Sequence, residues 1–114
     1  MSRETLFFLE DIETACNKIS RFTQKMSFAE FIKDEKTFDA VIRNLEIVGE
    51  AAKHLNEETC RQMPEIEWKK IKGLRDIVAH EYFGIDVEII WNIVCCKIPE
   101  LNQVVRLYKA NALK

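Results

Sequence analysis

Hydrophobic residues recur every three or four positions through most of this chain, which is the spacing of one face of an α-helix. Between residues 3 and 23 this spacing is kept by Leu6, Leu9, Ile12, Cys16, Ile19 and Phe22. Between residues 35 and 55 it is kept by Phe38, Val41, Ile42, Leu45, Val48, Ala52 and Leu55. The pattern predicts two long amphipathic helices, each with one face in the core.

Capping residues indicate where helices begin. Ser27 with Glu30 three positions later has the pattern of a capping box and predicts a short helix starting there, and Asp34 can cap the long helix that follows. Opposite its apolar face, the long helix carries a polar stripe of Arg43, Glu46, Glu50 and His54. Gly49 in mid-helix costs about 1 kcal/mol relative to Ala, and we expect the close approach of a neighbouring helix to compensate.

A polar break covers residues 56–67. After it, the pattern of hydrophobic positions predicts two more helical segments. The first begins near Trp68 and runs to about Ala79, and a short loop closed by Gly84 comes next. Asp86 can cap the last helix, with a hydrophobic staple between Ile85 and Ile90. Its core stripe is Val87, Ile90, Trp91, Val94, Ile98, Leu101, Val105 and Tyr108.

Pro99 predicts a kink in the last helix near residues 95–99, because proline lacks an N–H donor and crowds the carbonyl of Cys95. No segment shows the alternating pattern of a strand. We therefore predict an all-α protein, an antiparallel four-helix bundle with a short extra helix and a kinked C-terminal helix. At 114 residues we expect one domain over 1–114.

Composition narrows the function classes. The chain is 47% hydrophobic, which excludes intrinsic disorder, and its 17 basic and 19 acidic residues give a net charge of −2. Sequence-independent binding to nucleic acid needs an excess of Lys and Arg, so a generic basic coat is excluded, but a small local site that handles RNA is not. Such a site could gather Lys69, Lys70 and Lys72 where two copies meet.

The cysteines and the N-terminus bear on the compartment. Cys16, Cys60, Cys95 and Cys96 show no C-x-x-C spacing, so we expect small apolar residues in a reducing cytosol and no metal site. Acidic residues at 10, 11 and 13 argue against a signal peptide, and no apolar run reaches about 20 residues. The chain is expected to be cytoplasmic, with no membrane segment.

Candidate chemistry is concentrated around His80. Of the two histidines, His54 is interpreted as a solvated residue near a helix C-terminus, whereas His80 lies between Arg75 and Tyr82. An imidazole can move a proton from a ribose 2′-hydroxyl or to a leaving 5′-oxygen, and a guanidinium can hold a phosphate by two hydrogen bonds. An internal 2′-hydroxyl nucleophile would need no metal or other cofactor.

Helical geometry limits how this site can be assembled. At about 100° per residue, Arg75 and His80 point about 140° apart on one helix, whereas Arg75 and Tyr82 nearly share a face. Asp76, four residues before His80, can orient the imidazole. Either the helix ends before His80, or the site is assembled across a two-fold dimer.

The segment from Arg75 to Tyr82 matches R-x4-H-x-Y, the hallmark of the HepT-like family within the HEPN superfamily of helical domains. The flanking block 68–74, the stretch 82–86 and the later Ile98-Pro99-Glu100-Leu101 also resemble that family. Residues 43–51, which include Glu50, resemble its second-helix signature. The resemblance therefore covers most of the chain and implies a HEPN-like bundle.

The resemblance implies a metal-independent endoribonuclease, the toxin of a type VII HepT/MntA-like toxin–antitoxin module. It implies that Arg75 and His80 are catalytic, that Asp76 and Glu50 support them, and that two protomers meet at the active cleft. It also implies that a minimal nucleotidyltransferase of the MntA type neutralises the toxin by transferring AMP to Tyr82. The expected partners are thus a second copy, that antitoxin and RNA, with no DNA. Asp76 departs mildly from the family, which often has Asn there.

Two other interpretations remain open. The chain can be a non-catalytic helical binding module that pairs with a nucleotidyltransferase and binds nucleotide or RNA; the acidic balance and Asp76 favour this alternative. It can also be a purely structural dimerisation bundle. Alanine at all three motif positions would then alter nothing but stability.

Overall fold

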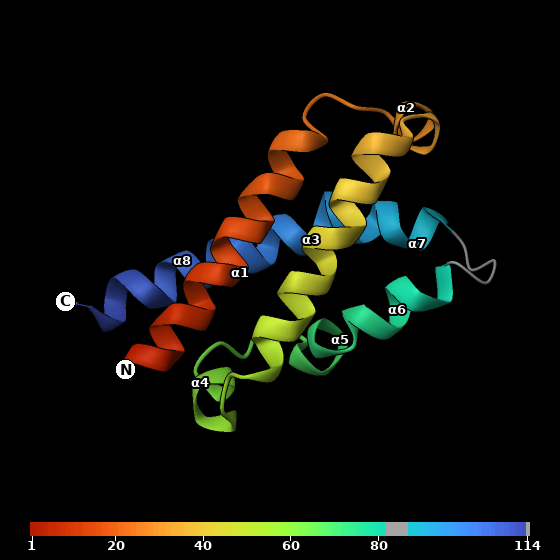
Figure 1. The fold of residues 1–114 in the computed structure, drawn as a ribbon. Helices are drawn as coiled ribbons and strands as arrows, with labels where there is room; N and C mark the ends of the chain where they lie inside the picture. Colours follow the sequence, from red (N-terminus) through yellow and green to blue (C-terminus); the bar gives the residue numbers. More distant parts are fainter. Residues whose placement is uncertain (82–86, 114) are drawn as a thin grey trace.

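The computed structural model describes residues 1–81 and 87–113, with side chains for 1–79 and 87–113, and in this part of the chain all regular structure is helical (Figure 1). The all-α prediction is confirmed. In chain order the elements are α1 (Arg3–Phe22), α2 (Phe28–Lys33), α3 (Glu35–Lys53), α4 (Glu57–Arg61), α5 (Trp68–Lys72), α6 (Leu74–Glu81), α7 (Val87–Asn92), the π-helix η1 (Ile93–Lys97) and α8 (Ile98–Ala112).

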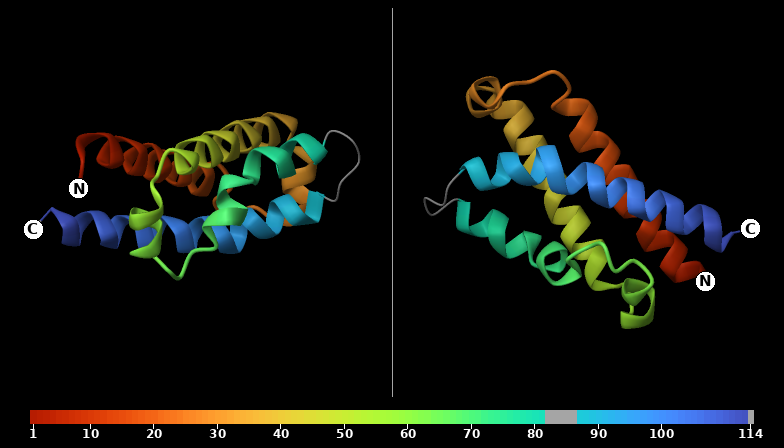
Figure 2. Two further views of the ribbon diagram at one scale, coloured as in Figure 1. Left: turned by 90° about the horizontal axis from the view of Figure 1, so that it is seen from below. Right: turned by 180° about the vertical axis from the view of Figure 1, so that it is seen from behind.

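Four segments build the bundle: α1, α3, the pair α5–α6, and the nearly continuous rod α7–η1–α8 (Figure 1). Helix α1 runs antiparallel to α3 and packs closely against it, and α8 also packs against α1. Helices α5 and α6 pack against α3, and Figure 2 shows the N- and C-terminal ends lying close together. This arrangement agrees with the predicted bundle.

The predicted helix starts are confirmed by their caps. Ser27 Oγ accepts the Glu30 N–H at 3.1 Å, and the Glu30 carboxylate accepts the Ser27 N–H at 2.9 Å. These two bonds form the capping box of α2 and lower the pKa of Glu30. Asp34 caps α3 by accepting the Thr37 N–H at 3.0 Å. Local side-chain chemistry therefore decides where both helices begin.

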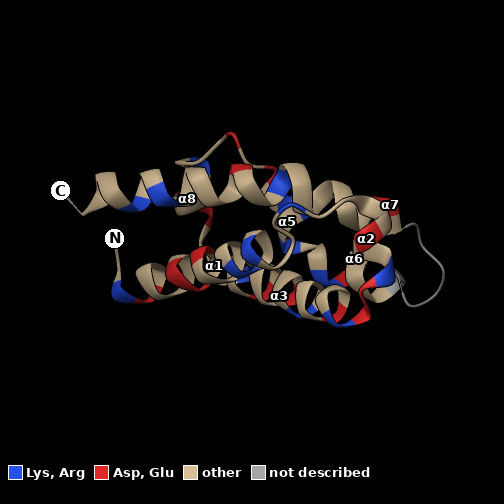
Figure 3. Ribbon diagram, turned by 90° about the horizontal axis from the view of Figure 1, so that it is seen from above, with Lys and Arg blue, Asp and Glu red and all other residues tan. Residues whose placement is uncertain are grey.

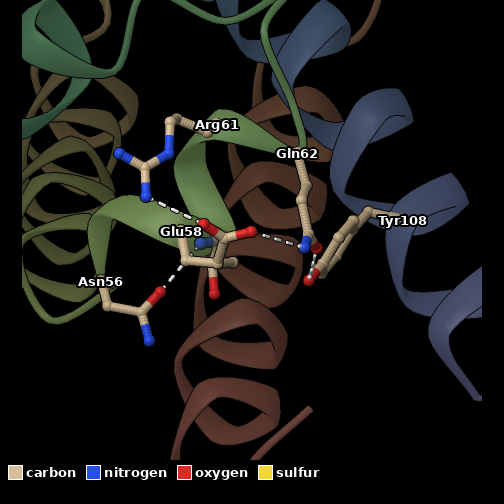
Figure 4. Close-up of polar contacts among 6 residues, drawn as sticks. Asn56, Glu58, Arg61, Gln62 and Tyr108 are labelled. Carbon is tan, nitrogen blue, oxygen red and sulfur yellow. Dashed lines mark hydrogen bonds and ion pairs between the residues drawn. The ribbon is translucent and has the colours of Figure 1, made fainter.

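The predicted polar break over residues 56–67 is partly wrong, because it contains α4. Asn56 Oδ1 accepts the Thr59 N–H at 2.8 Å and so caps this short helix (Figure 4). At its far end, Gln62 accepts a hydrogen bond of 2.6 Å from the Tyr108 hydroxyl of α8. Met63 and Ile66, which follow, are buried. Tertiary contacts, rather than amphipathic periodicity, stabilise a helix this short.

The helix predicted from Trp68 to about Ala79 is divided at Gly73 into α5 and α6. The Gly73 N–H is shared between the carbonyls of Lys69 and Lys70, so the first helix tightens and ends there. Helix α6 then continues through Glu81, two residues beyond the predicted end. The predicted loop residue Gly84, the cap Asp86 and the staple at Ile85 lie outside the described residues.

The kink predicted near Pro99 is confirmed and takes the form of η1. Pro99 stands in the first turn of α8, so η1 directly precedes the proline. A proline removes one intrahelical donor and crowds the preceding turn, and a single π-turn absorbs the mismatch. The rod therefore stays helical through η1, and it contacts α2 through α7 and α1 through α8.

The predicted apolar stripes form the core. Every member of the three stripes is buried except Leu6, Phe22, Phe38, Val87, Trp91 and Tyr108, which are partly buried. All four cysteines are free thiols, but the expectation of small apolar core residues holds only for Cys16, whose burial raises its pKa to about 12. Cys60 is partly buried, and the expectation is wrong for Cys95 and Cys96, which are exposed on η1. In the described part of the chain, no helix combines the length and apolarity needed to cross a bilayer.

Candidate functional site

Gly49 determines how closely α3 meets the helices of the motif. It is buried, and a methyl group there would lie 3.3 Å from the Leu74 side chain and 3.4 Å from the Arg75 backbone nitrogen. The missing side chain thus lets the backbone of α6 approach α3, which is the compensation predicted for a mid-helix glycine. The contact brings the residue after Gly49, Glu50, next to Arg75.

Glu50 and Arg75 form an ion pair across the two helices, with 3.7 Å between Glu50 Oε2 and Arg75 Nη1. The Arg75 side chain remains 62% exposed and the Glu50 side chain 52%. A pair so exposed contributes about 1 kcal/mol or less to stability. Its consequence is geometric: Glu50 restrains the guanidinium, while the N–H groups of Arg75 stay accessible to a ligand. The predicted proximity of Glu50 to the motif is confirmed.

His54 extends this contact to α1. Its Nε2 lies 3.6 Å from Glu50 Oε1, and its ring stacks on Phe8 with 4.5 Å between ring centroids and 8° between planes. The interpretation of His54 as merely solvated is therefore incomplete. The spacing from Glu50 to His54 was visible in the sequence as an i, i+4 pair, whereas the contact with Phe8 required the packing of α1 on α3.

A shallow hollow of about 200 Å³ lies beside this ion pair. Its lining is Arg43, Glu46, Ile47, Glu50 and Arg75, so the polar stripe predicted on α3 forms one wall and the motif arginine another. The two arginines and two glutamates balance in charge. In the view of Figure 3, segments carrying Lys or Arg are interspersed with segments carrying Asp or Glu along the helices.

The lysines predicted to join the site lie on α5. Lys70 is paired with Glu67 at 3.1 Å, and Glu67 also lies 3.7 Å from Lys97 on η1. Lys70 is therefore already neutralised by a neighbour, and Lys69 and Lys72 carry the remaining positive charge of this helix. Among the residues with described side chains, no three His, Cys, Asp or Glu groups are placed to hold a metal ion.

The backbone of His80 lies in α6, which runs to Glu81. The first of the two predicted arrangements, a helix that ends before His80, is therefore wrong. At about 100° per residue, positions 75 and 80 of this continuous helix lie about 140° apart around its axis. Asp76 is exposed in the first turn of α6. The side chain of His80 and the whole of Tyr82 lie outside the described residues.

Comparison with known proteins finds a matching family model and several similar proteins. Residues 12–107 match the family model described as "Ribonuclease HepT-like". A protein of Methanocaldococcus jannaschii named as a candidate RNase is 46% identical over 103 residues, which cover 87% of this chain and 85% of that protein. A protein of Thermococcus cleftensis named as a probable ribonuclease HepT is 44% identical over 102 residues, covering 90% and 93%. No solved structure matches this chain.

Proposed function

Because the chain belongs to the HepT-like ribonuclease family, we propose that it is a metal-independent endoribonuclease and the toxin of a type VII toxin–antitoxin module in the cytoplasm. The observation that carries the proposal is the position of Arg75. Its guanidinium is exposed, held by Glu50, and presented on the same helix as the backbone of His80. These are the two side-chain types needed to bind a phosphodiester and to move a proton beside it.

The proposed reaction uses the RNA's own nucleophile. The ribose 2′-oxygen attacks the adjacent phosphorus, the bond from phosphorus to the 5′-oxygen breaks, and a 2′,3′-cyclic phosphate and a free 5′-hydroxyl remain. His80 accepts the 2′-hydroxyl proton or protonates the departing 5′-oxygen. Arg75 donates hydrogen bonds to the phosphate oxygens and stabilises the negative charge that grows on them.

Glu50 and Asp76 have supporting roles in this proposal. Glu50 limits the positions that the Arg75 guanidinium can adopt, and His54 and Phe8 limit those of Glu50. Asp76 precedes His80 by four residues on α6, and this spacing supports a role in orienting the imidazole. Because Arg75 and His80 diverge on one helix, the active unit is a homodimer in which one protomer's Arg75 and its partner's motif share a substrate.

Cleavage of RNA by the purified protein tests the proposal directly. Single-stranded RNA should be cut equally well with Mg²⁺ and with excess EDTA, because the nucleophile is the substrate's own hydroxyl. Mass spectrometry of the fragments should show cyclic-phosphate ends. DNA of the same sequence, which lacks the 2′-hydroxyl, should stay intact and serves as the control. Loss of cleavage in EDTA, or cleavage of the DNA, would contradict this mechanism.

Tyr82 is proposed as the point of control. By its position in the motif it is the AMP acceptor for a cognate nucleotidyltransferase antitoxin of the MntA type. An adenylyl group there adds a negative charge and a base two residues from His80. The phosphodiester of that group can occupy the site meant for an RNA phosphate and exclude the substrate.

Co-expression with such a nucleotidyltransferase should raise the intact mass of the protein by one or more AMP groups and abolish RNA cleavage. The Tyr82→Phe variant should keep its unmodified mass and its cleavage activity, because it lacks only the acceptor oxygen. Tyr108→Phe is the matched control, since Tyr108 is the chain's other tyrosine and lies on α8. AMP retained on Tyr82→Phe would contradict the assignment.

A further inference from the structure

The hollow beside Arg75 is lined by two charged side chains in addition to the Glu50–Arg75 ion pair. Glu50 and Arg75 face one another at 3.7 Å, and Glu50 also faces His54. The other two charged side chains of the lining, Arg43 and Glu46, have no hydrogen bond or ion pair with any described side chain. Glu46 is nevertheless half-buried. The oxygens of the Glu46 carboxylate still reach solvent, so they are open to accept hydrogen bonds from the N–H groups of a ligand.

Arg43 and Glu46 lie on the same face of α3, one helical turn apart, and Ile47 lies between them and the core. The hollow therefore presents a forked donor, a two-oxygen acceptor and an apolar surface. At about 200 Å³ it is smaller than the roughly 300–1,000 Å³ of ordinary small-molecule pockets. A single planar ring system is the kind of group that suits this space.

Guanine is the RNA base whose edges match these groups. It has two adjacent acceptors, N7 and O6, which an arginine can bind in the bidentate manner that is its commonest base contact. It also has two adjacent donors, N1–H and the N2 amino group, which a carboxylate can accept together. Adenine and uracil alternate donors and acceptors, and cytosine has two adjacent acceptors but only one donor, so none of the three offers both pairs. Unpaired RNA bases are recognised on these edges by proteins in general.

We propose that Arg43, Glu46 and Ile47 form a subsite that binds a guanine base of single-stranded RNA next to the phosphate held by Arg75. Arg43 donates to N7 and O6, the Glu46 carboxylate accepts from N1–H and the N2 amino group, and Ile47 contacts the ring. The subsite determines which base the proposed ribonuclease prefers beside the cleaved phosphate, so this inference rests on the proposed function. The two arginines and two glutamates of the hollow balance in charge, so the hollow has no net positive charge that would attract every phosphate. Its selectivity is therefore for a base.

The test uses oligouridine strands that carry one guanosine, inosine, 7-deazaguanosine, adenosine or cytidine. Inosine lacks the N2 amino group, and 7-deazaguanosine lacks the N7 acceptor. The wild-type protein should cleave the guanosine strand next to that base with a kcat/KM roughly tenfold or more above the others. Glu46→Gln should no longer distinguish guanosine from inosine, and Arg43→Met should no longer distinguish guanosine from 7-deazaguanosine. Glu10→Gln, which neutralises an exposed carboxylate of α1, is the matched control and should keep both distinctions.

The outcomes separate this inference from the function it rests on. Equal cleavage of all strands by the wild-type protein would overturn the guanine subsite and leave the ribonuclease in place, and so would a guanosine–inosine distinction that survives in Glu46→Gln. Binding of the same strands to the wild-type protein gives a second readout that depends on no variant. Neither cleavage nor binding of any strand would overturn both proposals.

Discussion

Replacing His80 with alanine should lower the rate of RNA cleavage by about 10²- to 10⁴-fold, the contribution typical of a general acid–base group. The loss should fall on kcat, because the imidazole acts on protons in transit, whereas Arg75 and the hollow beside it hold the RNA. Initial rates on a fluorescent RNA, with binding measured separately, would show this division. A thermal melt should show that the variant remains folded.

His54 provides a matched control, since it is the only other histidine in the chain. It reaches Arg75 only through Glu50, so His54→Ala should cost no more than a few-fold in rate. Equal cleavage by the wild-type protein and His80→Ala would remove the catalytic role of His80. If neither protein cleaved RNA and both bound it, the chain would be a non-catalytic binding module.

Replacing Arg75 with alanine should lower kcat by about 10²- to 10³-fold, the typical effect of removing one group that stabilises transition-state charge. Arg75→Lys should recover only part of the loss, because an ammonium group keeps the charge but cannot offer two parallel N–H donors to a phosphate. RNA binding should also weaken in the alanine variant. Comparing kcat and KM for the three proteins measures both effects.

Arg61 is a suitable control for the removal of one positive charge. It lies on α4 and pairs with Glu58 at 2.8 Å, and both side chains are about two-thirds exposed. Because solvent screens so exposed a pair, Arg61→Ala should barely alter stability and should leave the cleavage rate near that of the wild type. Equal losses in Arg61→Ala and Arg75→Ala would mean that net charge, rather than the position of Arg75, governs activity.

Local patterns in the sequence predicted the helices whose stability is mainly local. The capping box at Ser27, the cap at Asp34 and the kink before Pro99 depend on residues within one or two turns, and all three are confirmed. Helix α4 was missed because five residues are too few to show an amphipathic period, although Asn56 caps it locally; its C-cap Gln62 is joined to the fold by a hydrogen bond from Tyr108, 46 residues away in sequence. A pattern read along the chain cannot show a partner so distant.

The candidate site, too, was predicted in part from local sequence patterns and depends in part on contacts between distant segments. The motif singled out Arg75 and His80, and helix periodicity predicted that these two positions lie on different faces of one helix. Periodicity did not show that α6 extends through Glu81, because the length of that helix depends on its packing against α3. The stripe on α3 was visible as a polar face, but nothing in its spacing showed that Glu46 would be half-buried and Glu50 paired with Arg75.

By itself the sequence determined that this protein is helical and which residues form its core, and it singled out the motif that we propose carries the chemistry. Each follows from residue type and spacing over one or two helical turns. Only the tertiary structure decided what stands beside the motif: Gly49 admits α6 to the surface of α3, and that contact places Glu50 and the hollow next to Arg75. Contacts between distant segments depend on side-chain volume and backbone approach in three dimensions, which a linear pattern does not encode.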